Sequence, residues 1–100
     1  MTTKPENVIT FRNPAIIEWL KEQGVEGTLM HYVRPADIAH KHVYGHLPYW
    51  LAAYADRVSE VSLPRLARAD RDRFNDGVIT TQEMDAAGAY VATYQVRNAG

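Results

Sequence analysis

The chain has 100 residues, a length typical of one domain with a single core. Hydrophobic residues make up 46% and charged residues 23%, a globular composition that argues against a disordered or fibrous chain. The absence of cysteine excludes disulfides, thiolate metal sites and a thiol nucleophile, and it favours a cytoplasmic location. Because the net charge is −1, a protein that binds duplex nucleic acid is not expected.

Membrane and export signals are also missing from the sequence. No apolar run approaches the roughly 18–20 residues that span a bilayer, and residues 1–7 are polar, unlike a signal peptide. We therefore expect no membrane association, one domain over residues 1–100 and a flexible tail over residues 1–6.

The first predicted elements are a strand and a helix. Residues 8–11 are β-branched or aromatic, which predicts a strand. Asn13 is a good N-cap and Pro14 suits the first helical position, so a helix is expected to begin there. Apolar residues recur at helical spacing until Gly24, which is typical of a helix end.

The middle of the chain predicts three more strands and a second helix. The strands are expected at residues 28–33, 42–44 and 59–63, with a connector at 37–41. Pro48 opens the helix. Trp50 and Tyr54 lie on its apolar face, together with Leu47 and Leu51, and are expected in the core.

The last third predicts a helix and a closing strand. Residues 64–74 are charged and form a short helix or a loop. Thr80 and Glu83 make a capping box that opens a helix over residues 81–91, and residues 93–97 alternate like a strand. The resulting β-α-β-β-α-β-α-β order predicts a small α/β domain with a mainly parallel sheet of about five strands and helices on both faces.

Two loops share one design. Arg12 and Asn13 follow the first strand, and Gly45 and His46 follow the third, each just before a predicted helix. The free N–H groups of a helix start favour anions, and a guanidinium fork suits phosphate oxygens. Gly45 would let the backbone approach a ligand, and His46 would exchange protons near neutral pH. The alternative is that these residues only cap helices and pair with carboxylates.

Two other residues beside these loops are candidate ligand contacts. Leu47 lies in the second loop, and Tyr49 falls in the first turn of the following helix, where it could stack on a base.

The sequence gives only weak indications of metal binding. Four histidines lie within sixteen residues, at positions His31, His40, His42 and His46. No acidic residue joins them at a familiar spacing, so neither a metal site nor a cofactor is expected. Residues 72–83 place Asp72, Asp76 and Glu83 at positions of an EF-hand loop, but Phe74 stands where an oxygen ligand is needed. Calcium binding therefore remains a second alternative.

Three segments together resemble a small CRISPR-associated Csx family. They are residues 8–19 (VITFRNPAIIEW), continued by residues 23–25, residues 43–52 (VYGHLPYWLA), and the last helix and strand within residues 79–97. The resemblance covers roughly residues 7–97. The chain differs from the family pattern at Asn13, where a histidine is common, and at His46, where a threonine is common.

The resemblance implies a Rossmann-like, three-layer domain related to CARF domains. It also implies a ring nuclease that binds cyclic oligoadenylate, with cyclic tetra-adenylate expected, and cleaves it without metal by 2′-hydroxyl attack. This reaction would switch off a type III CRISPR response in antiviral defence. Arg12 and His46 are the expected catalytic residues; the expected ligand contacts are Arg12, Asn13, Gly45, His46, Leu47 and Tyr49. A homodimer is expected, with the ligand across its two-fold axis. The alternative is a sponge or sensor that binds the nucleotide without cleaving it.

Overall fold

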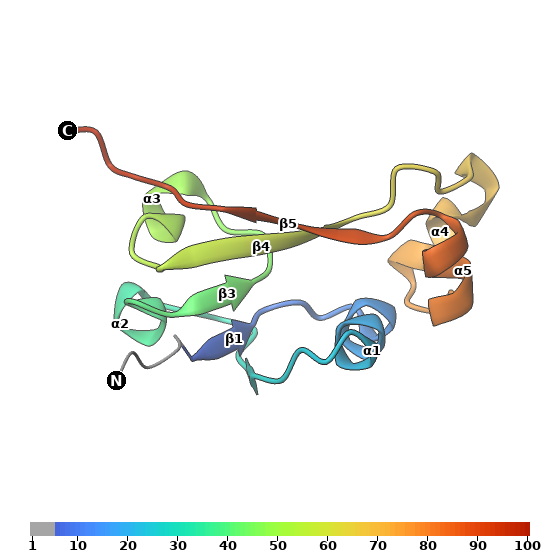
Figure 1. Ribbon diagram of the computed structural model, residues 1–100, viewed down its shortest axis with the longest axis horizontal. Coiled ribbons are helices and arrows are strands. Elements are labelled where there is room, and N and C mark those ends of the chain that lie inside the picture. The colour runs from blue at the N-terminus through green and yellow to red at the C-terminus, as the bar shows by residue number, and fades with distance from the viewer. Residues whose placement is uncertain (1–5) are drawn as a thin grey trace.

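A computed structural model describes residues 6–100, so all but the last residue of the expected tail lies outside the described part of the chain. The sheet contains five strands: β1 (Asn7–Ile9), β2 (Thr28–Leu29), β3 (His42–Tyr44), β4 (Arg57–Ser62) and β5 (Tyr90–Tyr94). Their order across the sheet is β2-β1-β3-β4-β5. The first four strands are parallel, and β5 runs antiparallel to β4 (Figure 1). The α/β class and a mostly parallel five-stranded sheet are confirmed.

The helices are short and lie at two ends of the sheet. They are α1 (Pro14–Glu22), α2 (Pro35–Ile38), α3 (Tyr49–Ala52), α4 (Arg71–Asn75) and α5 (Thr81–Ala86), with a 3-10 turn, η1 (Arg68–Asp70), before α4. The parallel strands point toward the end where α1, α4 and α5 lie, and α2 and α3 lie at the other end (Figure 1). Within residues 6–100, no helix is both long and apolar enough to cross a membrane.

Both predicted capping signals open helices in the structure. Asn13 Oδ1 accepts a hydrogen bond from the Ala15 amide at 2.9 Å, directly before α1. Thr80 Oγ1 accepts from the Glu83 amide at 3.1 Å, and the Thr80 amide donates to Glu83 Oε1 at 3.2 Å, which completes the capping box of α5. These contacts join residues two or three positions apart, so the local sequence suffices to predict them.

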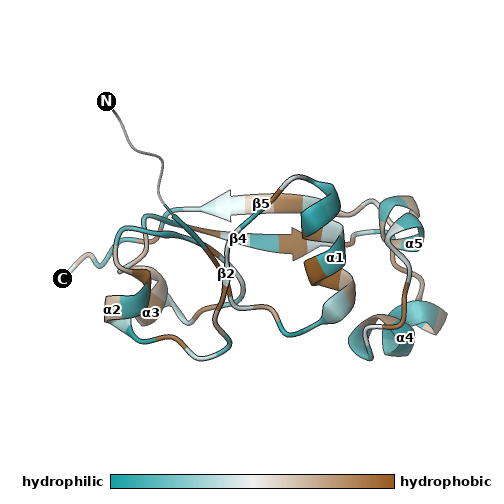
Figure 2. Cartoon of the chain, turned by 90° about the horizontal axis from the view of Figure 1, so that it is seen from below, coloured by the Kyte–Doolittle hydropathy of each residue, from teal (hydrophilic) through white to brown (hydrophobic). Residues whose placement is uncertain are grey.

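Two hydrophobic clusters hold the helices to the sheet. Ile9 and Tyr44 belong to the larger cluster, with α1 and Met84 of α5. Val8 and Val43 belong to the other, with Ile38 of α2 and Leu51 of α3. Successive strand residues point to opposite faces, so the two clusters lie on opposite faces of the sheet. By contrast, α4 has no buried residue and carries mostly hydrophilic side chains (Figure 2).

The closing strand and last helix differ from the prediction. The helix ends at Ala86 rather than continuing over residues 81–91, because Gly88 has a φ of 80° and reverses the chain. The strand then starts at Tyr90 rather than at residue 93, because its backbone pairs with β4 from Val58 to Ser62. Pairing with β4 outweighs the local helix signal.

The second strand and the second predicted helix are shorter than expected. Residues 28–33 contribute only Thr28–Leu29 to the sheet, and α2 replaces the expected connector at 37–41. Because α3 has only four residues, it buries Leu51 and Ala52 and leaves Trp50 66% exposed and Tyr54 52% exposed. The expectation that both aromatic residues belong to the core is wrong.

Candidate functional site

The strand order brings the two predicted loops together. From β1 the chain crosses to β2 on one side, and from β3 it crosses to β4 on the other, so the strand order switches between β1 and β3. Ligands of open parallel sheets bind at the carboxyl ends of strands at such a point. The loop after β1 (residues 10–13) therefore lies beside the loop after β3 (residues 45–48), and the Thr10 amide donates to the Tyr44 carbonyl at 2.9 Å.

Gly45 sits where the two loops are closest. A Cβ at this position would overlap Thr10 Oγ1 and lie 3.1 Å from Thr10 Cβ. Its φ is not positive, so the glycine is needed for space rather than for backbone conformation. The close approach at this glycine is to the Thr10 side chain, and the expected approach to a ligand stays a prediction.

His46 projects from the second loop toward β4. Its Nδ1 lies 3.5 Å from Glu60 Oε1, and its ring meets Phe11 edge-on with centroids 5.4 Å apart. The side chain is two-thirds exposed, so solvent and ligands can reach the imidazole. Phe11 fixes one side of the ring and Glu60 can orient a proton on Nδ1, which leaves Nε2 for proton transfer.

His46 lines a cavity of about 430 Å³ at the carboxyl ends of the strands, named here the edge cavity. Its polar lining also includes Ser62, Arg71 and Asn75, and Ile16 and Phe74 are among its apolar walls. None of the ion pairs formed between residues 6 and 100 involves Arg71. A guanidinium, an imidazole, a hydroxyl and an amide around one cavity can hold an anion.

Arg71 is the residue that the sequence did not single out. It is one of four arginines in the charged segment at residues 64–74, where neighbouring aspartates predict a solvated, self-compensating surface. That pattern describes Arg73, which pairs with Asp70 and Glu83. Nothing in the local sequence separates Arg71 from Arg73, because the cavity forms only when α4 meets the ends of β3 and β4.

Arg12 and Asn13 do not line the edge cavity. The Arg12 guanidinium carbon is 4.4 Å from the centroid of the Tyr32 ring, on the β2 side of the switch point. The Asn13 side chain caps α1 and also donates from Nδ2 to the Phe74 carbonyl at 2.7 Å. Asn13 therefore caps α1, as the structural alternative has it, and it also joins α4 to α1.

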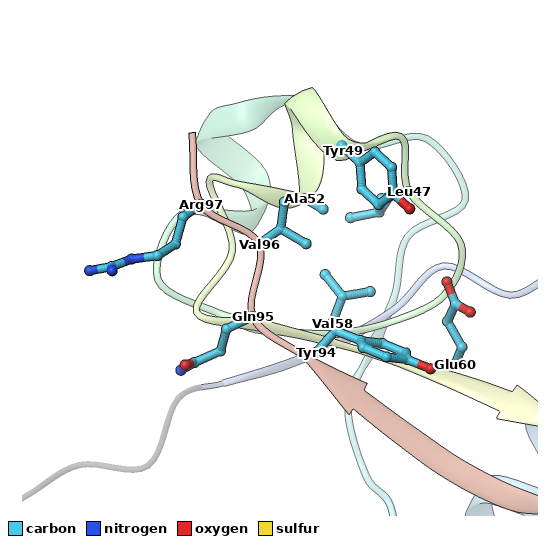
Figure 3. A pocket seen from close by; sticks show the side chains of 9 residues that line it. All are labelled: Leu47, Tyr49, Ala52, Val58, Glu60, Tyr94, Gln95, Val96 and Arg97. Atoms are coloured by element: carbon cyan, nitrogen blue, oxygen red, sulfur yellow. The ribbon is translucent and has the colours of Figure 1, made fainter. Parts of the chain in front are cut away.

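Leu47 and Tyr49 line a different cavity, of about 550 Å³, on the face of the sheet that carries α3 (Figure 3). This hollow, named here the face cavity, also contains Val58, Glu60 and Tyr94. Glu60 belongs to the face cavity and contacts His46 of the edge cavity, so the His46–Glu60 pair separates the two. The predicted site residues are thus divided among the edge cavity, the face cavity and the loop at the start of α1.

His42 is held in place by its neighbours in the sheet. Its Nε2 is 2.6 Å from Ser59 Oγ, which lies 2.7 Å from Thr93 Oγ1, so a polar chain crosses three strands. Its ring also stacks on Tyr44 at 4.4 Å. Burial, and then the nearby Arg57 charge, lower the pKa of His42 below its usual 6.5. Across the described range, no three His, Asp or Glu side chains gather in a metal-binding group.

The segment that resembles an EF-hand is a helix, a turn and a capped helix. Arg73 holds the Glu83 carboxylate through two hydrogen bonds, of 2.7 and 2.9 Å. These bonds, and then the Thr80 amide, lower the pKa of Glu83 from 4.5 to about 2. The carboxylate that would close a calcium loop is therefore engaged in the packing of α4 against α5.

A scan against protein-family models and searches of curated proteins and of solved structures found no match to this chain.

Proposed function

We propose that this protein binds cyclic oligoadenylate at the carboxyl ends of its parallel strands and cleaves it as a metal-independent ring nuclease. One observation carries the proposal: the two predicted loops lie side by side at the switch between β1 and β3, where His46 and Arg71 line one cavity. The resemblance of the same loops to the Csx family supplies the ligand and the type III CRISPR context.

The proposed reaction needs positioning, charge stabilisation and proton transfer. A ribose 2′-hydroxyl attacks the adjacent phosphorus, the bond to the 5′-oxygen breaks, and a 2′,3′-cyclic phosphate and a 5′-hydroxyl form. Arg71 stabilises the charge that develops on the phosphoryl oxygens, and Arg12 is a second cation for a neighbouring phosphate. His46 takes the proton of the 2′-hydroxyl or gives one to the leaving oxygen, and Glu60 holds its ring.

The proposal extends to the fold and the assembly. We also propose a Rossmann-like, three-layer architecture of the CARF type, and the hydrophobic cluster on each face of the sheet supports it. The edge cavity, at about 430 Å³, is small for a ring of four nucleotides, so a homodimer brings two copies together around one ligand. We expect the protein to act in the cytoplasm, where it would encounter such a messenger.

The test incubates the full chain with labelled cyclic tri-, tetra- and hexa-adenylates, with calcium or with chelator, and separates the products by chromatography. Linear products in chelator support the ring nuclease. A ring that is bound but recovered intact supports the sponge instead. A response to calcium without nucleotide binding supports the calcium alternative and overturns the proposal. Light scattering that finds a monomer with and without the ring refutes the dimer.

A further inference from the structure

The face cavity combines aromatic side chains, an apolar wall and a carboxylate. Tyr49 and Tyr94 stand on opposite sides of the hollow, and Glu60 lies at the phenol end of Tyr94 (Figure 3). Val58, which is 4% exposed, and Val96 form the apolar wall between them. The Gln95 and Arg97 side chains point away from the hollow (Figure 3).

The two tyrosines leave much of their surface to solvent. Tyr49 is 83% exposed and Tyr94 is 54% exposed, although both have an apolar wall beside them. Aromatic side chains on either side of an apolar wall can stack on any nucleobase. A carboxylate at the end of the hollow adds an acceptor, which favours a base with an amino group.

We propose that the face cavity binds an adenine base of the cyclic oligoadenylate, with the base beside Tyr94 and Tyr49 and its 6-amino group donating to Glu60. The inference rests on the proposed function, which supplies the adenine. It places the base and the phosphate on the two sides of the His46–Glu60 pair. A base that reaches Glu60 then positions the adjoining ribose near His46, because both side chains belong to one contact of 3.5 Å.

The first experiment compares two tyrosines of the same strand. Tyr94 and Tyr90 lie on β5 four residues apart, on one face of the sheet, and are 54% and 51% exposed, but only Tyr94 lines the face cavity. Calorimetry with cyclic tetra-adenylate should show about tenfold weaker binding for Tyr94→Ala, as for the loss of a stacking partner. Tyr90→Ala is the matched control, because it also removes an exposed tyrosine of β5. It should bind within twofold of the parent, since Tyr90 does not line the face cavity.

The second experiment tests the amine contact. The probe is a cyclic tetranucleotide of purine riboside, which lacks the 6-amino group. The parent should bind it about tenfold more weakly than cyclic tetra-adenylate, and Glu60→Gln should reduce this preference. Methyl NMR of the parent should show ring-current shifts for Val58 and Val96 when cyclic tetra-adenylate is added.

The outcomes separate this inference from the proposed function. If the parent binds cyclic tetra-adenylate but the two tyrosine variants bind alike and the valine methyls do not shift, the base lies elsewhere and only the inference fails. Equal binding of the two rings by the parent removes the amine contact and overturns the role of Glu60. If the parent binds neither ring, both proposals fail.

Discussion

Gly45→Ala tests how closely the two loops of the candidate site are packed. The new Cβ would overlap Thr10 Oγ1 and lie 3.1 Å from Thr10 Cβ. Rotation of the Thr10 side chain removes the first contact, at the loss of only a long 3.5 Å hydrogen bond to the Tyr44 carbonyl. The second contact does not change with rotation, so the backbones of the two loops must separate. Overpacking of this kind costs about 1–3 kcal/mol.

Urea and thermal unfolding measure this cost. For a domain of this size, 1 kcal/mol corresponds to roughly 4–8 °C in Tm. A Tm lower by roughly 5–20 °C is therefore expected for Gly45→Ala, with an unchanged dependence of the unfolding free energy on urea. Cleavage of the ring should also fall, because His46 follows the displaced residue directly.

A double-mutant cycle identifies the cause. Thr10→Gly removes Cβ, so the pair Thr10→Gly/Gly45→Ala should be about 1 kcal/mol more stable than the sum of the single effects predicts. Thr10→Ala removes Oγ1 but keeps Cβ, and it should give no such recovery. The reasoning is refuted if Gly45→Ala unfolds at the parental midpoint, or if both Thr10 variants rescue it equally.

Three further predictions concern the charged groups. His46→Ala should leave ring binding within a few-fold and slow cleavage by about 10²-fold, as for a lost general acid or base; cleavage at the parental rate would mean that the site works by positioning alone. Arg71→Ala should weaken ring binding by about 10–100-fold, and Arg12→Ala by less; the reverse order would move the phosphate to the β2 side. Because Arg73 lowers the pKa of Glu83 to about 2, the stability that Glu83 contributes is fully present above pH 4.5 and lost as the pH falls to about 2. Melting curves of the parent and Glu83→Gln should therefore approach each other as the pH falls toward 2, and a difference in Tm at pH 2 as large as the one at neutral pH would contradict this.

The candidate site shows where sequence reasoning succeeds and where it stops. His46 and Gly45 could be singled out because they stand between a strand and a helix, a position read from neighbouring residues. Arg71 could not, since His46 and Ile16, which line the edge cavity with it, are 25 and 55 residues away in the chain. The reason for Gly45 was also hidden, because Thr10 is 35 positions away and meets it only through the pairing of β1 with β3.

The sequence by itself determined the features that depend on contacts within one turn or one strand. The caps at Asn13 and Thr80, the start of α1 and the bounds of β3 follow from residues within a few positions of one another. The tertiary structure decided the order of the strands, the antiparallel direction of β5 and the exposure of Trp50. These features depend on hydrogen bonds between strands that are distant in the chain and on which side chains the neighbouring elements bury. Such interactions contribute to stability only once the sheet has formed.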